Sequence, residues 1–258
     1  MEDDQRLSRI ATQWSIVRQA HGQADQQRHV AQQTLLDRYG GAMRRYLIAA
    51  LRDADAADEV FQDFALRFVR GDFQSADPEH GRFRSFLKTI LFRMVTDHHR
   101  RNQRRRRHEV PTSDELPEVA DAGVDECGND VDFTNSWREN LLARSWEQLH
   151  DAQRSGGSPF YTILRCRFEH PDATSQELAE RLSEQSEKKY TAGNVRVLVH
   201  RARDRFAEFL LEEVAASLDG GSLDRLEQEL IDLRLHGYCR EVLARLRQRA
   251  SLQGENHE

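Results

Sequence analysis

The sequence predicts an all-α protein with two small helical domains. Apolar residues recur at helical spacing along most of the chain, and runs with strand-like alternation are few. Hydrophobic residues make up 38% and charged residues 32% of the 258 residues, which suits small, surface-rich helical units better than one large buried sheet. An acidic stretch in the middle of the chain separates two apolar, helical halves.

The first half, residues 1–108, is predicted to form one helical domain. Apolar positions over 27–52 indicate an amphipathic helix in which Gly40-Gly41 is a candidate break. A second helix is expected over 56–69, because Gly71 then stops the pattern. A third is expected over 83–101 and runs directly into a cluster of arginines.

Charge is strongly segregated around the predicted domain boundary. Residues 93–108 hold seven arginines and one acid, Asp97, whereas residues 109–132 hold nine acids and no base. The formal net charge of −6 therefore does not argue against a nucleic-acid partner. Uniform negative charge with Pro111, Pro117, Gly123 and Gly128 predicts a flexible acidic linker over 109–135.

The second half is predicted to form a domain over 136–218, followed by a helical extension over 219–258. Residues 174–209 indicate two helices joined by a turn, with Thr174 or Ser175 capping the first and Thr191 capping the second. In the extension, leucines at helical spacing predict two helices that separate at Gly237. The extension is a candidate regulatory hairpin.

The second helix of this pair is predicted to have a packing side and a basic side. The packing side contains Val195, Leu198, Ala202 and Phe206, at steps of three and four residues. The basic residues fall largely on other faces, as a helix-turn-helix requires. Asn194 and Arg196 are the expected base readers, and a solvated arginine-bearing helix in an ordinary bundle is the alternative.

The third helix of the first domain combines aromatic and basic residues. Phe83, Phe86 and Phe92 accompany the cations, a combination suited to stacking on unpaired bases while cations hold the backbone. These phenylalanines could instead be core residues, and Phe86 is expected to be partly so. The acidic face from Asp58 to Asp63 is either a solvated surface or a dock for a basic protein surface.

No cofactor, metal or catalytic residue is expected. Cys127, Cys166 and Cys239 are far apart and lack the spacing of a zinc site or a disulfide framework, which fits a reducing cytoplasm. Neither an apolar signal core near Met1 nor a stretch long enough to span a membrane is visible, so the protein is expected to be soluble, unprocessed and cytoplasmic.

Taken in order, the motifs resemble the extracytoplasmic-function (ECF) group of sigma-70-type sigma factors. The likeness covers residues 32–107 and 137–218. Sigma region 2 is resembled by Leu36-Asp-Arg-Tyr39, by the segment from Ala57 to Asp63, and by the segment from Phe83 to Arg101. Sigma region 4 is resembled by residues 160–167, 177–180 and 194–203, the last of which end in His-Arg-Ala-Arg.

This resemblance implies a promoter-specificity subunit with no chemistry of its own, which melts DNA by capturing flipped bases. The implied partners are the core RNA polymerase, through the clamp and flap of its large subunits, and promoter DNA, with an anti-sigma factor as a further candidate. The implied polymerase-binding residues are Asp58, Glu59, Gln62 and Asp63. The implied −10 element residues are Phe86, Lys88, Arg93, Asp97, Arg100 and Arg101. The implied −35 element residues are Thr191, Asn194, Arg196, His200, Arg201 and Arg203.

Three features depart from the family pattern. Phe86 stands where tryptophan is common, and Arg93 stands where a small polar residue is usual. The turn from Glu184 to Tyr190 is longer than the family's short connection. The tail beyond Leu218 has no counterpart in ordinary members of the family.

Two other classes of function remain open from the residues alone. A helix-turn-helix regulator that never engages polymerase would need an effector pocket or a dimer interface in its other half, and the acidic segment at Asp58 to Asp63 opposes it. A metal-dependent nuclease could use Asp97, His98 and His99. Adjacent histidines on a helix point about 100° apart, however, and no metal-binding motif supports such a site.

Overall fold

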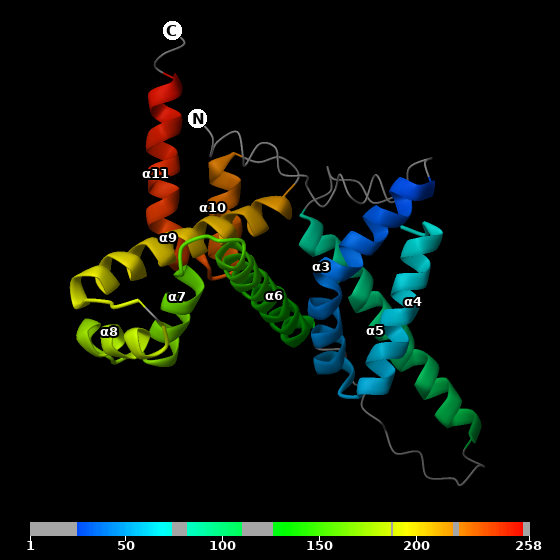
Figure 1. Cartoon of the computed structure of the whole chain (residues 1–258). Helices are drawn as coiled ribbons and strands as arrows, with labels where there is room; N and C mark the ends of the chain where they lie inside the picture. Colours follow the sequence, from blue (N-terminus) through cyan, green and yellow to red (C-terminus); the bar gives the residue numbers. More distant parts are fainter. Residues whose placement is uncertain (1–24, 74–81, 110–125, 187, 219–221, 255–258) are drawn as a thin grey trace. The chain divides into compact units, whose positions relative to one another are not determined.

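All regular structure in the described part of the chain is α-helical, which confirms the predicted fold class (Figure 1). The computed structural model describes residues 25–73, 82–109, 126–186, 188–218 and 222–254. Within these ranges there are helices and connecting turns but no strand. The helices are α3 (Asp25–Leu51), α4 (Ala54–Arg70), α5 (Phe83–Glu109), α6 (Glu126–Arg154), α7 (Phe160–Glu169), α8 (Ser175–Glu184), α9 (Ala192–Ala216), α10 (Leu223–Asp232) and α11 (His236–Gly254).

The described residues divide into two compact units. The N-terminal unit holds α3, α4, α5 and the part of α6 up to Asn140, together with the end of α9 from Ala216. The C-terminal unit holds the rest of α6 from Leu141 and the helices α7 to α11. The division within α6 lies five residues beyond the predicted end of the linker at residue 135. The assignment of functions to the two halves stays a prediction.

The N-terminal unit is built around aromatic side chains from four helices. Tyr39 of α3 stacks on Trp137 of α6 with ring centroids 4.5 Å apart, and Phe83 of α5 lies 5.5 Å from Tyr39. All three side chains are fully buried. Helix α4 closes the unit through its buried residues Ala57, Val60, Phe61, Phe64 and Phe68. Large aromatic groups give so small a unit a sizeable apolar core.

The ends of α4 follow from local chemistry. The carboxylate of Asp53 accepts hydrogen bonds from the amides of Asp55 and Ala56, which otherwise lack helical partners. At the other end Gly71 has a φ of 86°, a left-handed conformation that glycine adopts without strain. The predicted stop at Gly71 is confirmed.

The expected break at Gly40-Gly41 is wrong, since α3 is a continuous helix from Asp25 to Leu51. A Cβ atom on Gly40 would lie only 3.2 Å from Cζ of Phe61 in α4. The glycine therefore permits a close approach of two helices, and the packing gained there offsets its poor helix propensity.

The predicted irregular structure up to residue 135 is wrong from Glu126 onward, where α6 begins. Phe133 and Trp137 stand one turn apart on α6, and both are buried in the N-terminal unit. The amide of Asn140 donates a hydrogen bond to the carbonyl of Arg38 over 3.0 Å, and Arg45 donates to the carbonyl of Ser136 over 3.2 Å. Tertiary packing thus overrides the poor helix propensity of the acidic segment. The remaining predicted linker, residues 110–125, lies outside the described residues.

In the C-terminal unit, α7, α8 and the start of α9 share a small core. Its buried members are Ile163, Cys166, Leu178, Ala179, Leu182 and Val195. Thr174 caps α8 in a capping box, in which its hydroxyl accepts from the Glu177 amide while the Glu177 carboxylate accepts from the Thr174 amide. The amide of Asn194 donates to Oγ1 of Thr191 over 3.2 Å, so the predicted cap of α9 is also confirmed.

Helices α10 and α11 form a hairpin, but they separate at Leu233-Arg234-Leu235 rather than at Gly237. Arg234 has a φ of 56°, and the amide of Leu235 donates to the carbonyl of Leu230 over 2.7 Å. Burial of Leu233 and Leu235 on either side offsets the cost of this conformation for a side-chain-bearing residue. Gly237 lies inside α11.

Candidate nucleic-acid interface

Helix α4 presents an acidic face to solvent. Asp58, Glu59 and Gln62 are exposed and Asp63 is half-buried, on the side opposite Phe61 and the other core residues. The Asp58 side chain is 61% exposed and pairs with Arg44 of α3, whose Nε lies 3.4 Å from a carboxylate oxygen. The Arg44 guanidinium also lies over the Phe61 ring, 4.2 Å from its centroid. The face is therefore acidic, with Arg44 at its edge.

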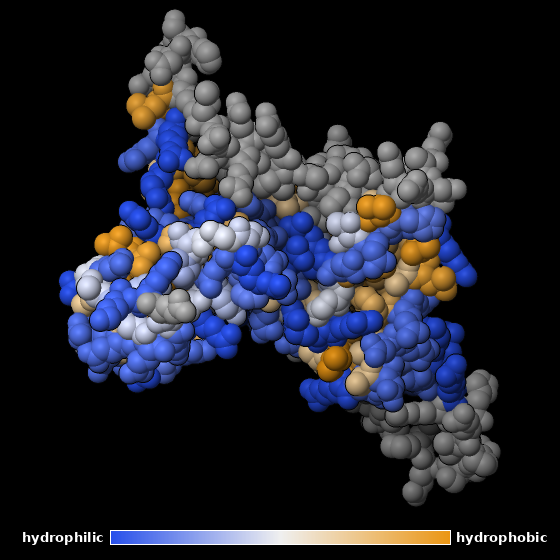
Figure 2. All heavy atoms as spheres, in the orientation of Figure 1, coloured by the Kyte–Doolittle hydropathy of each residue, from blue (hydrophilic) through white to orange (hydrophobic). Residues whose placement is uncertain are grey.

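Two exposed apolar residues extend this acidic face. Leu66 and Val69 of α4 are exposed and lie at helical spacing from Gln62, on the same side of the helix. Figure 2 shows apolar residues at the surface over α3 and α4, beside hydrophilic ones. An acidic surface with an apolar margin suits a protein partner better than a nucleic acid, whose phosphates would repel the carboxylates.

Helix α5 brings most of the predicted −10 residues onto one stripe. With 3.6 residues per turn, Phe86, Arg93, Asp97 and Arg100 fall within about 60° of one another around the helix axis, with Arg101 at the margin. Arg93, Asp97, Arg100 and Arg101 are exposed. Asp97 lies 3.9 Å from the Arg100 guanidinium, so one carboxylate partly balances the arginines of the stripe.

Lys88 does not join this stripe. It follows Phe86 by two residues, which places it about 160° from Phe86 around the axis of a continuous helix. Arg104 lies on the stripe at helical spacing from Arg93, Asp97 and Arg100 and is exposed. Arg104 belongs to the arginine run, and extending the stripe by seven residues from Asp97 would have singled it out.

Phe86 is half-buried, as expected for a residue that is partly core. Its ring lies 6.2 Å from that of Phe83 and 6.5 Å from that of Phe73, which follows α4. Phe83 is fully buried. Of the two, Phe86 alone keeps exposed ring surface on which a base could stack.

The three residues of the nuclease hypothesis do not converge. His98 is buried and its Nε2 lies 2.9 Å from the amide nitrogen of Asn102, whereas His99 is exposed and Asp97 faces Arg100. Desolvation, and secondarily the neighbouring His98, lowers the pKa of His99. Among the described residues, the group whose ligand atoms could share a metal ion is a different one, formed by His200, Asp204 and Glu241.

Helix α9 separates packing from exposed basic residues, as predicted. Val195, Ala202 and Phe206 are buried and Leu198 is partly so. The exposed side chains include all the predicted −35 residues, namely Thr191, Asn194, Arg196, His200, Arg201 and Arg203. Asn194 and Arg201 lie toward one edge of the exposed side and Arg196 and Arg203 toward the other. Arg205 lies outside this set, because it is half-buried, pairs with Glu208 at 2.7 Å and lies over the Phe209 ring.

The end of the lengthened turn before α9 packs against the core shared by α7, α8 and α9. The backbone amide of Tyr190 donates to Oγ of Ser183 over 2.9 Å, and the Tyr190 ring packs against the core of α7, α8 and α9. Lys188 and Lys189 are exposed immediately before the N-terminus of α9. These lysines are not among the residues predicted from the sequence, although a basic pair beside a candidate recognition helix is a signal for phosphate contact.

Comparison with known families finds a match within the N-terminal unit. A model of sigma-70 region 2 matches residues 35–105, from α3 through most of α5. No curated protein and no solved structure matches the chain. The matched segment contains the acidic face of α4 and the stripe of α5. It supports a sigma-70 family sigma factor, for which core RNA polymerase and promoter DNA are the partners that the family implies.

The match leaves most of the chain unassigned, since α6 to α11 lie outside it. In the described residues no helix is both long and apolar enough to cross a membrane.

Proposed function

We propose that the chain is an ECF-type sigma factor that directs core RNA polymerase to promoters and assists their melting. The region 2 match over residues 35–105 carries this proposal. The exposed, capped helix α9 in a unit outside that match supports a second DNA contact. The chain provides recognition, and the polymerase performs the phosphoryl transfer.

In this proposal the acidic face of α4 docks on a basic surface of the polymerase clamp. Asp58, Glu59 and Gln62 are exposed and would steer the encounter through complementary charge. Leu66 and Val69 would add the apolar contact that keeps a complex together after the encounter.

The stripe of α5 engages the −10 element as a single strand. Phe86 offers ring surface for stacking, while Arg93, Arg100 and Arg104 hold phosphates. Binding to the separated strand offsets the few kcal/mol that unstacking a base costs. Lys88, on another side of α5, would contact a different part of the complex.

The α8–α9 pair engages the −35 element. The N-terminal residues Asn194 and Arg196 would reach base edges, and Arg201, Arg203 and the turn lysines would hold the backbone. The residues at the N-terminus of α9, including the capping residue Thr191, are exposed, and the helix dipole there favours phosphate.

Co-elution with purified bacterial core RNA polymerase in size-exclusion chromatography tests the proposal. The wild-type chain should co-elute, and the double variant Asp58→Arg with Gln62→Ala should not, because both changes fall on the acidic face. The matched control is Asp37→Arg with Gln33→Ala, which makes the same two substitutions at a hydrogen-bonded pair on the exposed side of α3. Equal loss in the control would contradict the assignment of this face.

A stand-alone helix-turn-helix regulator is the second candidate, because the exposed basic side of α9 alone could bind DNA. It predicts a folded protein that binds duplex DNA in a salt-dependent way and never co-elutes with polymerase. Circular dichroism of the same sample would establish that the protein is folded.

A further inference from the structure

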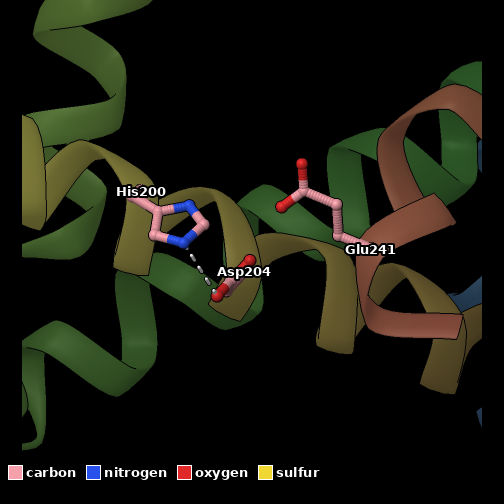
Figure 3. Close-up of side chains that lie close together, drawn as sticks. All are labelled: His200, Asp204 and Glu241. Carbon is pink, nitrogen blue, oxygen red and sulfur yellow. Dashed lines mark ion pairs between the residues drawn. The ribbon is translucent and has the colours of Figure 1, made fainter. Parts of the chain in front are cut away.

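Three side chains that could ligate a metal ion meet where the C-terminal hairpin passes α9. His200 and Asp204 stand one turn apart on α9, and Glu241 extends toward them from α11 (Figure 3). Nε2 of His200 lies 4.0 Å from Oδ2 of Asp204. The three ligand atoms all lie within 4.8 Å of one another.

The donor set matches a zinc-class ion. Imidazole nitrogens and carboxylate oxygens are both zinc ligands, and a zinc site with three protein ligands holds water in the fourth position. Zinc ligands bound at about 2.0–2.1 Å lie about 3.3 Å apart in a tetrahedron, so these side chains must approach by about 1 Å. His200 is 65% exposed, which leaves its ring room to make that movement. A spacing of four residues presents both α9 ligands on one side of the helix.

An ion pair with Arg245 orients the Asp204 carboxylate and leaves one of its two oxygens available to a metal ion. Nη2 of Arg245 lies 3.0 Å from Oδ1 of Asp204, while Oδ2 of the same carboxylate faces His200. Glu241 forms no ion pair with another described residue, although its carboxylate approaches this group. An ordinary interhelix charge network accounts for Asp204 and Arg245, whereas Glu241 has no ion pair of its own among the described residues. A divalent ion between the two carboxylates would balance the remaining negative charge.

We propose that His200, Asp204 and Glu241 bind one divalent transition-metal ion of the zinc class, which clips the C-terminal hairpin to α9. The ion would cross-link residues from α9 and α11, and Arg245 would hold Asp204 in the ligating orientation. Mg²⁺ would not substitute, because it prefers six oxygen ligands in an octahedron.

The clip has a consequence that rests on the proposed function. His200 is one of the exposed α9 residues proposed to contact the −35 element, so the bound ion and DNA would compete for it. Metal availability would then set the DNA affinity of the C-terminal unit.

Zinc binding to the full chain tests the site without DNA or polymerase. The chain carries the substitution Cys127→Ser, because the Cys127 thiol could compete for zinc. After metal removal, isothermal titration calorimetry measures the binding of Zn²⁺ and of Mg²⁺. The expected result is one Zn²⁺ per chain and no Mg²⁺. His200→Ala and Glu241→Gln should each weaken Zn²⁺ binding at least tenfold.

Matched substitutions in the same unit control for the chain's other histidines and acids. His150→Ala removes a histidine that also neighbours an aspartate on a helix, and Glu180→Gln removes an exposed glutamate of α8. Neither should change the affinity. No stoichiometric Zn²⁺ binding, or equal effects from all four substitutions, would overturn the proposal.

Visible absorption of bound Co²⁺ and thermal stability are readouts that do not depend on affinity alone. Co²⁺ in a four-coordinate site of nitrogen and oxygen ligands gives visible absorption bands that hydrated Co²⁺ lacks, and these should disappear in Glu241→Gln. Zn²⁺ at a hundredfold excess over its Kd should also raise the Tm of the wild-type chain by several °C and leave that of Glu241→Gln unchanged. Failure of polymerase co-elution would leave these results untouched, so the two proposals fail separately.

Discussion

At the scale of single residues, burial governs the chemistry of the cysteines. Cys239 of α11 is fully buried against α9, and its Sγ lies 3.9 Å from the carbonyl oxygen of Ala207. Desolvation raises the pKa of its thiol to about 12, and the pKa of the Cys166 thiol is also raised, chiefly by desolvation. Both residues are therefore structural core rather than reactive groups.

We expect Cys239 to resist alkylation by iodoacetamide at pH 8 in the folded chain and to react fully in urea. The reason is that almost none of the thiol is ionised at that pH and the reagent cannot reach it. Peptide mass mapping of native and unfolded samples measures this. Rapid native labelling of Cys239 would show that the hairpin opens from α9.

The side of α5 on which a residue lies should decide its part in DNA binding. Arg93→Ala and Arg100→Ala should each weaken binding of the polymerase complex to mixed-sequence single-stranded DNA by several fold, because both lie on the stripe with Phe86. Each should also lower the slope of log affinity against log salt by about 0.7. Lys88→Ala, on another side of the helix, serves as the comparison. An equal loss from Lys88→Ala would show that the stripe is not the contact.

At the scale of elements, charged contacts join the two helices of the C-terminal hairpin. Nη2 of Arg247 lies 2.7 Å from Oε2 of Glu227 and 2.9 Å from Oδ1 of Asp224, while His236 lies 3.1 Å from Glu227. The hydrogen bond from Arg247 is the main cause that lowers the pKa of Glu227. The group is partly exposed, so each pair contributes modestly.

Glu227→Gln should lower the Tm by about 2 °C at pH 7. Because the folded-state pKa of Glu227 lies below its unfolded value, its contribution is present above the unfolded pKa and is lost as the pH falls through the folded pKa. The difference in Tm should therefore begin to shrink as the pH falls below the unfolded pKa of about 4.3, and it should vanish below the folded pKa. Thermal unfolding at several pH values measures it, and a difference that persists at low pH would mean that packing, not charge, is responsible.

Local chemistry predicted several element boundaries correctly. Thr174, Thr191 and Gly71 act at the helix ends where their side chains or conformational freedom imply that they should. The break at Gly40-Gly41 and the turn at Gly237 were wrong for the same reason. Contacts between helices, with Phe61 and with the buried leucines beside Arg234, outweighed the propensities of these glycines.

At the scale of the whole molecule, the acidic segment 110–125 joins α5 to α6, and both units of the chain expose basic residues. A hypothesis from charge alone is that this segment occupies the proposed DNA-binding surfaces in the free protein. The acidic stretch of the sequence covers residues 109–132, but deletion as far as Asp132 would also remove the first turns of α6. Substitution is therefore confined to residues 114–125.

Replacement of residues 114–125 by a Gly/Ser segment of equal length should increase the affinity of the free protein for duplex DNA several-fold at low salt, with a smaller increase at high salt. A version with the same residues in scrambled order keeps charge and length and should behave as the wild type. Fluorescence anisotropy measures the affinity. No change on removing the charge would reject self-masking.

The sequence by itself determined the helical class, most helix ends, the packing side of α9 and the resemblance to sigma factors, because these depend on periodicity and on local hydrogen bonds. Tertiary structure alone decided that α6 begins at Glu126 and that Glu241 meets His200 and Asp204. Such features depend on which surfaces pack together. Burial of Phe133 and Trp137, together with the approach of α11 to α9, supplied that information.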